Sequence, residues 1–294
     1  MYKTALLYRK YREQLRHMPD VVPMSEMQFS VFAQEHLKGL SFVETDGGLL
    51  YYDLAFDGDR LHCTVPVYGY SADREKTAVR LFTLLAQRIA QQGACDYQVN
   101  LYSEDAEVIR AFHMMQFFTM AEKCVTSIRE LCAEPDRGIV IRPVPKDELD
   151  LRWKEVWQAV HQIVLHLQAS PVFYPGKEFT EEVYRGFFLS EETEVLAAFD
   201  GDSIVGIIEW NREPNLLMGG ENSVNVGEIY VYPEYRNKNL SKALLCAAQQ
   251  QAKAAGYGVM WVEHGTANPN ARGFWNKYFQ PYEYQLFRTI EPVR

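Results

Sequence analysis

The sequence has no apolar run that approaches the roughly 20 residues needed for a membrane-spanning helix. It also lacks an excess of basic residues, because 30 lysines and arginines stand against 39 aspartates and glutamates, for a formal net charge of -9. Nucleic-acid binding requires clustered positive charge, so this balance argues against nucleic acid as the main partner. We therefore expect neither a membrane nor a nucleic acid among the partners.

Cysteine is scarce, and its spacing carries no motif. The five cysteines, none in a C-x-x-C pair, are Cys63, Cys95, Cys124, Cys132 and Cys246. An odd number without paired spacing indicates neither a zinc site nor a disulfide framework, so no metal is predicted. Reduced thiols are typical of the cytoplasm, which is the location we expect.

The chain is long enough for two domains. It has 294 residues, of which 47% are hydrophobic. The charged segment AEPDRG, residues 133–138, follows one complete set of helices and strands and predicts a domain boundary. Each half reads as two helices, a run of two or three strands, a helix, a strand and a helix, and the second half adds a first and a last strand. We predict an α/β fold with two tandem domains, 1–135 and 136–294, each a mixed, mostly antiparallel sheet flanked by helices.

The elements follow from apolar periodicity and turn residues. Ser25 is a predicted helix cap, and Asp-Gly at 57–58 predicts a hairpin turn. Helices are predicted at 1–17, 25–37, 73–92, 106–118, 149–167, 179–189, 240–256 and 270–279. Strands are predicted at 49–56, 61–68, 97–102, 139–144, 194–199, 203–210, 227–232, 257–264 and 282–290.

The stretch from Tyr230 to Leu245 is the part of the chain that most clearly indicates a ligand. A short apolar strand runs into a polar turn, residues 236–239, and then becomes helical. The first amides of a helix have no intrahelical partner, and the positive end of its dipole lies there. Arg236 and Lys238 add positive charge, so the segment predicts a phosphate or pyrophosphate site.

This turn resembles that of the GNAT superfamily of acyl-CoA-dependent N-acetyltransferases, a resemblance that covers about residues 138–290. The family has V-x-P at the end of a strand and [QR]-x-x-G-x-[GA] at the start of the next helix. Val231, Pro233 and the segment from Arg236 to Ser241 match this pattern. Asn239 and Ser241 stand where the family has glycine. Asn tolerates the left-handed conformation better than most residues, so a phosphate cradle is still feasible.

A second family signature, N-x-x-A-x-x-[LF]-Y, lies at the last predicted helix. Asn268, Ala271 and Phe274 match it, and Trp275 replaces the tyrosine. The resemblance implies acetyl-CoA as co-substrate. It implies these cofactor-binding residues: Tyr230, Val231, Arg236, Asn237, Lys238, Asn239, Leu240, Ser241 and Asn268.

The resemblance also implies direct attack of a primary amine on the acetyl thioester in a ternary complex, which needs a base and an acid. Glu228 lies on the strand before the turn, where related enzymes often hold a base; an exposed strand glutamate is the other interpretation. Trp275 cannot supply the proton, so Tyr278 or His264 is expected as the acid. A lone histidine is more often a structural hydrogen-bonding residue than a catalytic acid.

Aromatic residues suggest an acceptor site. Trp153, Trp157 and His161 share one face of a predicted helix. With Phe173, Tyr174 and Trp210 they could line a pocket for an organic amine. Aromatic residues at this helical spacing are more often part of the hydrophobic core.

The first half resembles a degenerate copy of the same fold. Its corresponding turn, Gly69 to Lys76, lacks the family motif, and Asp73 and Glu75 would repel a pyrophosphate. We therefore expect the cofactor only in the second half.

Three functions are left open. The first is an N-acetyltransferase that acts on a small-molecule or peptide amine. The second is a non-catalytic acyl-CoA-binding or interaction protein, and the third is a GNAT-fold transferase with another acyl donor. A homodimer also stays open.

Overall fold

The computed structural model describes residues 2–18, 21–57, 60–71, 73–128, 133–136, 138–169, 179–213 and 222–291. The chain divides into two compact units. The first unit contains Met1–Cys124 and His264–Arg294, and the second unit contains Val125–Glu263. The chain therefore leaves the first unit, builds the second, and returns to the first.

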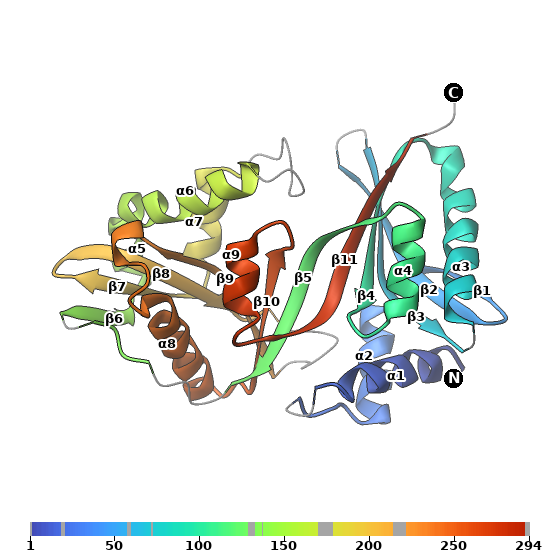
Figure 1. Ribbon diagram of the computed structural model, residues 1–294, viewed down its shortest axis with the longest axis horizontal. Coiled ribbons are helices and arrows are strands. Elements are labelled where there is room, and N and C mark those ends of the chain that lie inside the picture. Colours follow the sequence, from blue (N-terminus) through green and yellow to red (C-terminus); the bar gives the residue numbers. More distant parts are fainter. Residues whose placement is uncertain are drawn as a thin grey trace. The chain divides into compact units, whose positions relative to one another are not determined.

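The first unit is a sheet with helices (Figure 1). Its strand order is β1-β2-β3-β4-β11-β5. The strands are β1 (Ser41–Thr45), β2 (Gly48–Asp57), β3 (Arg60–Tyr70), β4 (Cys95–Tyr102), β11 (Gln280–Ile290) and β5 (Phe118–Ser127), whose last residues pass into the second unit. The helices are α1 (Tyr2–Leu15), α2 (Glu26–His36), α3 (Arg74–Ile89), the 3-10 turn η1 (Ala90–Gln92), α4 (Ala106–Met114) and α9 (Pro269–Trp275).

Local sequence explains most of these elements. Ser25 caps α2 through a capping box with Gln28, as the sequence predicts. The predicted hairpin is present, because β2 and β3 pair antiparallel; its turn at 58–59 lies outside the described residues. On α3, the buried residues Leu81, Leu85 and Ile89 recur at helical spacing and face the sheet.

The C-terminal strand completes the first unit. β11 pairs antiparallel with β4 over eight residue pairs, from Glu283 with Tyr102 to Ile290 with Cys95. This division differs from the predicted domains, which separate at residues 135 and 136. In the sequence β11 follows the second half of the chain, but its backbone hydrogen bonds are made with β4, a strand of the first half.

The second unit is a sheet covered on both faces. Its strand order is β10-β9-β8-β7-β6. The strands are β6 (Ile139–Pro143), β7 (Thr193–Asp200), β8 (Ser203–Asn211), β9 (Ser223–Val231) and β10 (Val259–Gly265), whose last residues belong to the first unit. The helices are α5 (Lys146–Leu151), α6 (Trp153–Ala169), α7 (Glu181–Leu189), the 3-10 turn η2 (Pro233–Tyr235) and α8 (Leu240–Ala254).

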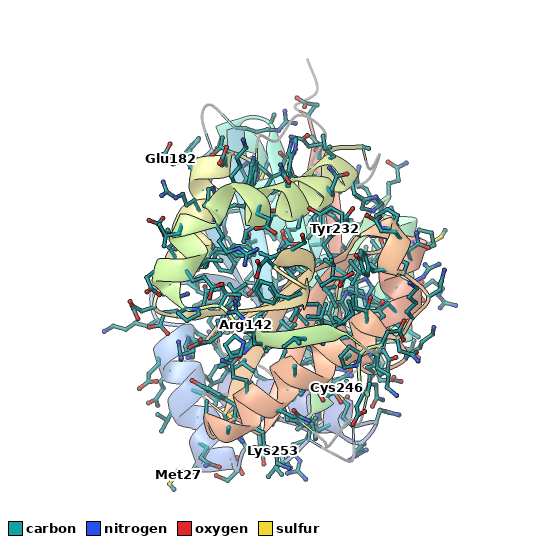
Figure 2. The ribbon with its side chains drawn as sticks, turned by 90° about the vertical axis from the view of Figure 1, so that its left-hand side faces the viewer. Met27, Arg142, Glu182, Tyr232, Cys246 and Lys253 are labelled. Carbon is teal, nitrogen blue, oxygen red and sulfur yellow. The ribbon has the colours of Figure 1, made fainter. Side chains whose placement is uncertain are left out.

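Helices α6 and α7 cover one face of this sheet and α8 covers the other. α6 contacts β8 and β9, α7 contacts β7, and α8 contacts β6 to β9. In Figure 2, Cys246 and Lys253 mark α8, while Glu182 marks α7 on the other side of Arg142 of β6. The core beneath α6 and α7 includes Val156, Val160 and Phe188, none of them exposed. The mixed sheet flanked by helices is the predicted fold class.

Three local predictions differ from the structure. β1 is absent from the prediction because only Val43 of its five residues is buried, which leaves no alternation to detect. β5 is also absent from it, because Glu122 and Lys123 interrupt its apolar pattern. The long helix predicted at 149–167 is divided into α5 and α6 at Arg152.

Among the helices described, none combines the length and the apolar character that a membrane span requires.

Leu286 tests the contribution of β11 to the first unit. This side chain is fully buried opposite Val99 of β4. We expect Leu286→Ala to lower the free energy of unfolding by about 2–5 kcal/mol, because it leaves a cavity in the core. Exchange of backbone amide hydrogens in Leu286→Ala should accelerate more in β4 than in β7. Val140→Ala, at a residue 58% exposed, is the control. Equal effects of the two variants would contradict the assignment of β11 to this core.

Candidate functional site

A β-bulge in β9 is the centre of the candidate site. Ile208 of β8 pairs with Ile229 of β9, and Trp210 pairs with Val226. Glu209 alone therefore lies opposite two residues, Gly227 and Glu228. Such a bulge twists the strand locally and redirects the side chains at that point.

The carboxylate of Glu209 holds this bulge in place. Its Oε1 atom accepts a hydrogen bond from the Glu228 amide at 2.9 Å, and the side chain is only 1% exposed. A Cβ added at Gly227 would collide with the same Oε1 atom. Glycine at 227 is therefore what allows the carboxylate to approach the bulged backbone.

Both carboxyl groups have raised pKa values. Burial raises the pKa of Glu209 to about 8; the hydrogen bond from the Glu228 amide opposes this shift, and the Glu228 charge adds to it. Desolvation raises the pKa of Glu228 to about 7, and the hydrogen bond from Tyr184 opposes the shift. Glu228 is partly exposed and Glu209 is not, so Glu228 is the group that can exchange protons with a ligand.

An aromatic row from α6 and α7 leads to Glu228. The hydroxyl of Tyr184 donates to Glu228 Oε1 at 3.3 Å. The ring of Trp157 lies 5.9 Å from that of Tyr184, and stacks with Trp153 at 6.2 Å and with His161 at 5.3 Å. Exposure along this row increases from buried Trp153 to exposed His161. The row thus runs from the core to the surface beside the carboxyl group.

The other aromatic residues predicted for this pocket do not join the row. Trp210 is 1% exposed, and its Nε1 donates to Gln251 of α8, on the opposite face of the sheet. Trp210 is therefore a core residue. Phe173 and Tyr174 lie outside the described residues.

The predicted phosphate turn follows β9 and leads into α8. Asn237 and Asn239 both adopt positive φ, at 63° and 58°, the left-handed conformation that asparagine tolerates. Asn239 is the N-cap of α8, but no side chain caps the helix, and its first turn contains no acidic residue. The first amides of α8 therefore keep their donors for an anion, and the residues present fit a pyrophosphate.

The remaining residues of the turn either stabilise its backbone or contribute positive charge. Arg236 Nε donates to the carbonyl of Val231 at 2.9 Å, and its guanidinium lies 5.5 Å from the centre of the Tyr230 ring. Lys238 is exposed, whereas Leu240 is buried and anchors the helix start. Ser241 is half-buried in the first turn of α8. Positive charge therefore remains at the surface of the turn.

The equivalent helix start in the first unit is closed to an anion. The N-cap of α3, Asp73, accepts a hydrogen bond from the Lys76 amide with its own carboxylate. Glu75 adds a second acidic side chain in the first turn. Two acidic side chains at this helix start disfavour an anion there.

Beyond the start of β9, pairing with β10 ends. The parallel register contains Ser223 with Val259, Val224 with Met260 and Asn225 with Trp261. From Val226 to Val231, among the residues described, the recorded partners of β9 lie on β8 alone. This edge carries backbone groups that an extended ligand could meet.

Three predicted site residues belong to the first unit and not to the unit that holds Glu228. His264 is 6% exposed, and its Nε2 lies 3.3 Å from Glu122 Oε2 and 3.7 Å from Cys124 Sγ. Tyr278 is half-buried in the turn after α9, with its ring 5.3 Å from that of Phe274. Asn268 caps α9 by accepting from the amides of Asn270 and Ala271. Within its own unit, each of them therefore has structural contacts.

Sequence reasoning missed Glu209 and Tyr184. Glu209 lies in the apolar run SIVGIIEW, where a single acid is a detectable signal because buried glutamates are rare. Tyr184 has no comparable signal, since a tyrosine on an amphipathic helix is ordinary.

Glu209→Gln tests the buried carboxyl group through the pH dependence of stability. Because the folded-state pKa is raised to about 8, the stabilisation is complete below the unfolded pKa of about 4.3 and is lost as pH rises through 8. Glutamine cannot ionise, so the free energy of unfolding of the variant should decline less between about pH 5 and 9. Urea unfolding measures this difference, with the exposed Glu234→Gln as the control. Parallel curves for Glu209→Gln and the unmodified protein would contradict the raised pKa.

Comparisons with known proteins indicate which family model and which fold this chain resembles. Residues 160–279 match the model of the acetyltransferase (GNAT) family. No curated protein matches the chain significantly in sequence. A GCN5-related N-acetyltransferase from Sphaerobacter thermophilus has a similar structure, with 13% identity and a TM-score of 0.58; the match covers 92% of this chain and 89% of that one.

A tandem GNAT protein from the clavulanic acid biosynthesis pathway is also similar in structure, with 13% identity and a TM-score of 0.50. The match covers 87% of this chain and 85% of that one. Both likenesses extend over the N-terminal half, which therefore shares the GNAT-like fold. The chain therefore has a GNAT-like fold in both halves, and its residues 160–279 match the acetyltransferase (GNAT) family model.

Proposed function

We propose that this protein is an acetyl-CoA-dependent N-acetyltransferase that transfers an acetyl group to a primary amine by direct attack in a ternary complex. The observation that carries the proposal is that a single strand, β9, bears a carboxyl group with a pKa near 7 and then leads into an uncapped helix start. A proton acceptor and an anion site thus follow one another along the chain, as amine acylation by a CoA thioester requires.

Glu228 is the proposed general base. An amine arrives at neutral pH mainly as an ammonium ion and must lose a proton before it attacks. A carboxyl group with a pKa near 7 is about half ionised at that pH and can accept this proton. The hydrogen bond from Tyr184 of α7 fixes the orientation of the Glu228 carboxylate. The attacking nitrogen then forms the amide bond as the thioester bond breaks, and the CoA thiolate takes up a proton.

The turn and the unpaired edge of β9 are the proposed acetyl-CoA site. The amides at the start of α8, with Arg236 and Lys238 nearby, would hold the pyrophosphate. Backbone amides on the free edge of β9 would hydrogen-bond the extended arm of CoA and polarise the thioester carbonyl. Acetyl-CoA supplies the activated acyl group, and every other group named here belongs to the chain.

The acceptor is proposed to be an organic amine, free or in a peptide. Trp157 and His161 offer aromatic faces next to Tyr184, and aromatic faces attract ammonium groups. The CoA thiolate takes its proton from solvent in this proposal, because Tyr278 and His264, the acids expected from the sequence, belong to the first unit and not to the unit that holds Glu228.

Removal of the Glu228 carboxylate tests the base. Acetyl-CoA is supplied with spermidine, glucosamine and a lysine-containing peptide, and thiol release is followed. We expect kcat/KM of the unmodified protein to rise with pH through about 7, because Glu228 ionises there. Glu228→Gln should reduce kcat/KM by about 10²–10⁴-fold and remove this rise. Glu234→Gln, an exposed acid at η2, is the matched control and should keep the profile.

Two outcomes would count against the proposal. If calorimetry detects acetyl-CoA binding but no amine yields thiol, the protein is an acyl-CoA-binding module. If Glu228→Gln retains the activity and the pH profile, Glu228 is not the base even though the reaction occurs.

Asn239 tests the turn. Glycine populates φ near 58° freely, so Asn239→Gly should preserve or lower the dissociation constant of acetyl-CoA. Asn239→Val should weaken binding by about tenfold, because a left-handed L-residue costs roughly 1–2 kcal/mol and valine is β-branched. Calorimetric titration measures both variants. Markedly weaker binding by Asn239→Gly would show that this turn is not the pyrophosphate site.

A further inference from the structure

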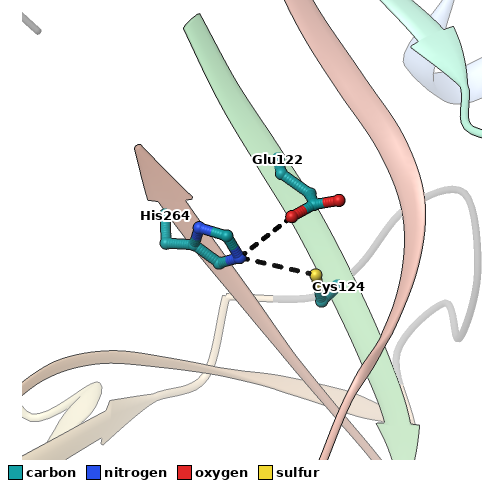
Figure 3. A group of neighbouring side chains, drawn as sticks. All are labelled: Glu122, Cys124 and His264. Carbon is teal, nitrogen blue, oxygen red and sulfur yellow. Dashed lines mark hydrogen bonds and ion pairs between the residues drawn. The ribbon is translucent and has the colours of Figure 1, made fainter. Parts of the chain in front are cut away.

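Three metal-binding side chain types meet in the interior of the first unit. Glu122 and Cys124 lie on β5, His264 lies at the end of β10, and all three are buried (Figure 3). One ligand atom from each lies within 4.8 Å of the others. Their chemistry is unlike that of the proposed acetyl transfer site, which lies in the second unit.

The separations fit a tetrahedral zinc ion. With Zn–N and Zn–O bonds near 2.0 Å and Zn–S near 2.3 Å, tetrahedral angles place N and O about 3.3 Å apart and N and S about 3.5 Å apart. In this protein His264 Nε2 lies 3.3 Å from Glu122 Oε2 and 3.7 Å from Cys124 Sγ. Two of the three separations are therefore near tetrahedral values, and the third, between Glu122 and Cys124, is within 4.8 Å.

The charges also balance. Glu122 would bind the ion as a carboxylate, the form in which this side chain ligates zinc. With a thiolate at Cys124, two negative ligands would neutralise one divalent cation. Neutrality matters here, because an unbalanced charge in the interior is costly.

Two further observations point to an ion. Glu122 Oε2 is buried and makes no hydrogen bond of good geometry among the described residues, and His264 Nε2 lies 3.3 Å from it. Asn276 and Tyr284 form hydrogen bonds with the Glu122 carboxylate, as groups around a ligating carboxylate commonly do. Asn276 Oδ1 also lies 3.5 Å from Cys124 Sγ.

We propose that Glu122, Cys124 and His264 form a structural site for a zinc-like divalent cation. Thiolate and imidazole ligands favour zinc over magnesium or calcium, which prefer oxygen ligands. Binding deprotonates the Cys124 thiol, so a proton leaves to solvent as the metal–sulfur bond forms.

The position of the site gives it a structural role. Cys124 is the last residue of the first segment of the first unit, and His264 is the first residue of its second segment. These residues are 140 positions apart in the sequence. A bound ion would join the point where the chain leaves this unit to the point where it returns.

The test uses the full chain, freed of metal with a chelator and then titrated with Zn²⁺ or Co²⁺. We expect about one zinc ion per chain and a higher Tm, by about 5 °C or more, in the loaded protein. Bound Co²⁺ should show a thiolate-to-metal charge-transfer band and the visible bands of tetrahedral cobalt. Release of about one proton per zinc ion should accompany binding at neutral pH.

Variants distinguish this site from other thiols. Cys124→Ser should lose the charge-transfer band and weaken zinc binding by more than about a hundredfold. Cys246→Ser is the matched control, a buried cysteine on α8 that should keep both. A charge-transfer band that persists in Cys124→Ser would overturn the assignment. The assignment would also be overturned if the unmodified protein bound no zinc and gave no charge-transfer band. The three residues would then be a hydrogen-bonded group only.

Discussion

One hydrogen bond, from the Glu228 amide to the buried carboxylate of Glu209, fixes the geometry of the candidate site. Because the acceptor comes from the neighbouring strand, β9 must carry an extra residue at this point, and the extra residue turns Glu228 toward α6 and α7. The same carboxylate requires glycine at 227. One buried acid, Glu209, therefore sets the register between β8 and β9 and the direction of the Glu228 side chain, and the two carboxyl groups influence each other's proton affinity.

The parts of the site that sequence reasoning predicted are those encoded locally. The turn between β9 and α8 could be recognised because amide exposure, helix dipole and left-handed asparagine all depend on a few consecutive residues. The structure confirms the conformation expected at Asn239. Glu228 was selected from its strand position, and the structure adds a pKa near 7. Most helices and strands were predicted for the same reason, since their periodicity lies within each segment.

The parts that sequence reasoning missed depend on contacts between distant residues. Glu209 acquires its role from the opposing strand, and β5 conceals its strand pattern because Glu122 and Lys123 face partners from the far end of the chain. Cysteine spacing suggested no metal site, because the candidate ligands come from two strands and follow no motif. The boundary near residue 135 followed composition, whereas the compact units follow the pairing of β11.

The position of β11 between β4 and β5 also has a consequence for biosynthesis. β4 emerges from the ribosome before the second unit, but its antiparallel partner β11 is translated only after that unit. Until then β4 presents an open edge, which other chains can pair with. The first unit to be synthesised is thus the last to be completed, while the second unit can close its sheet earlier. Nascent chains of this protein would need protection of that edge for most of their translation.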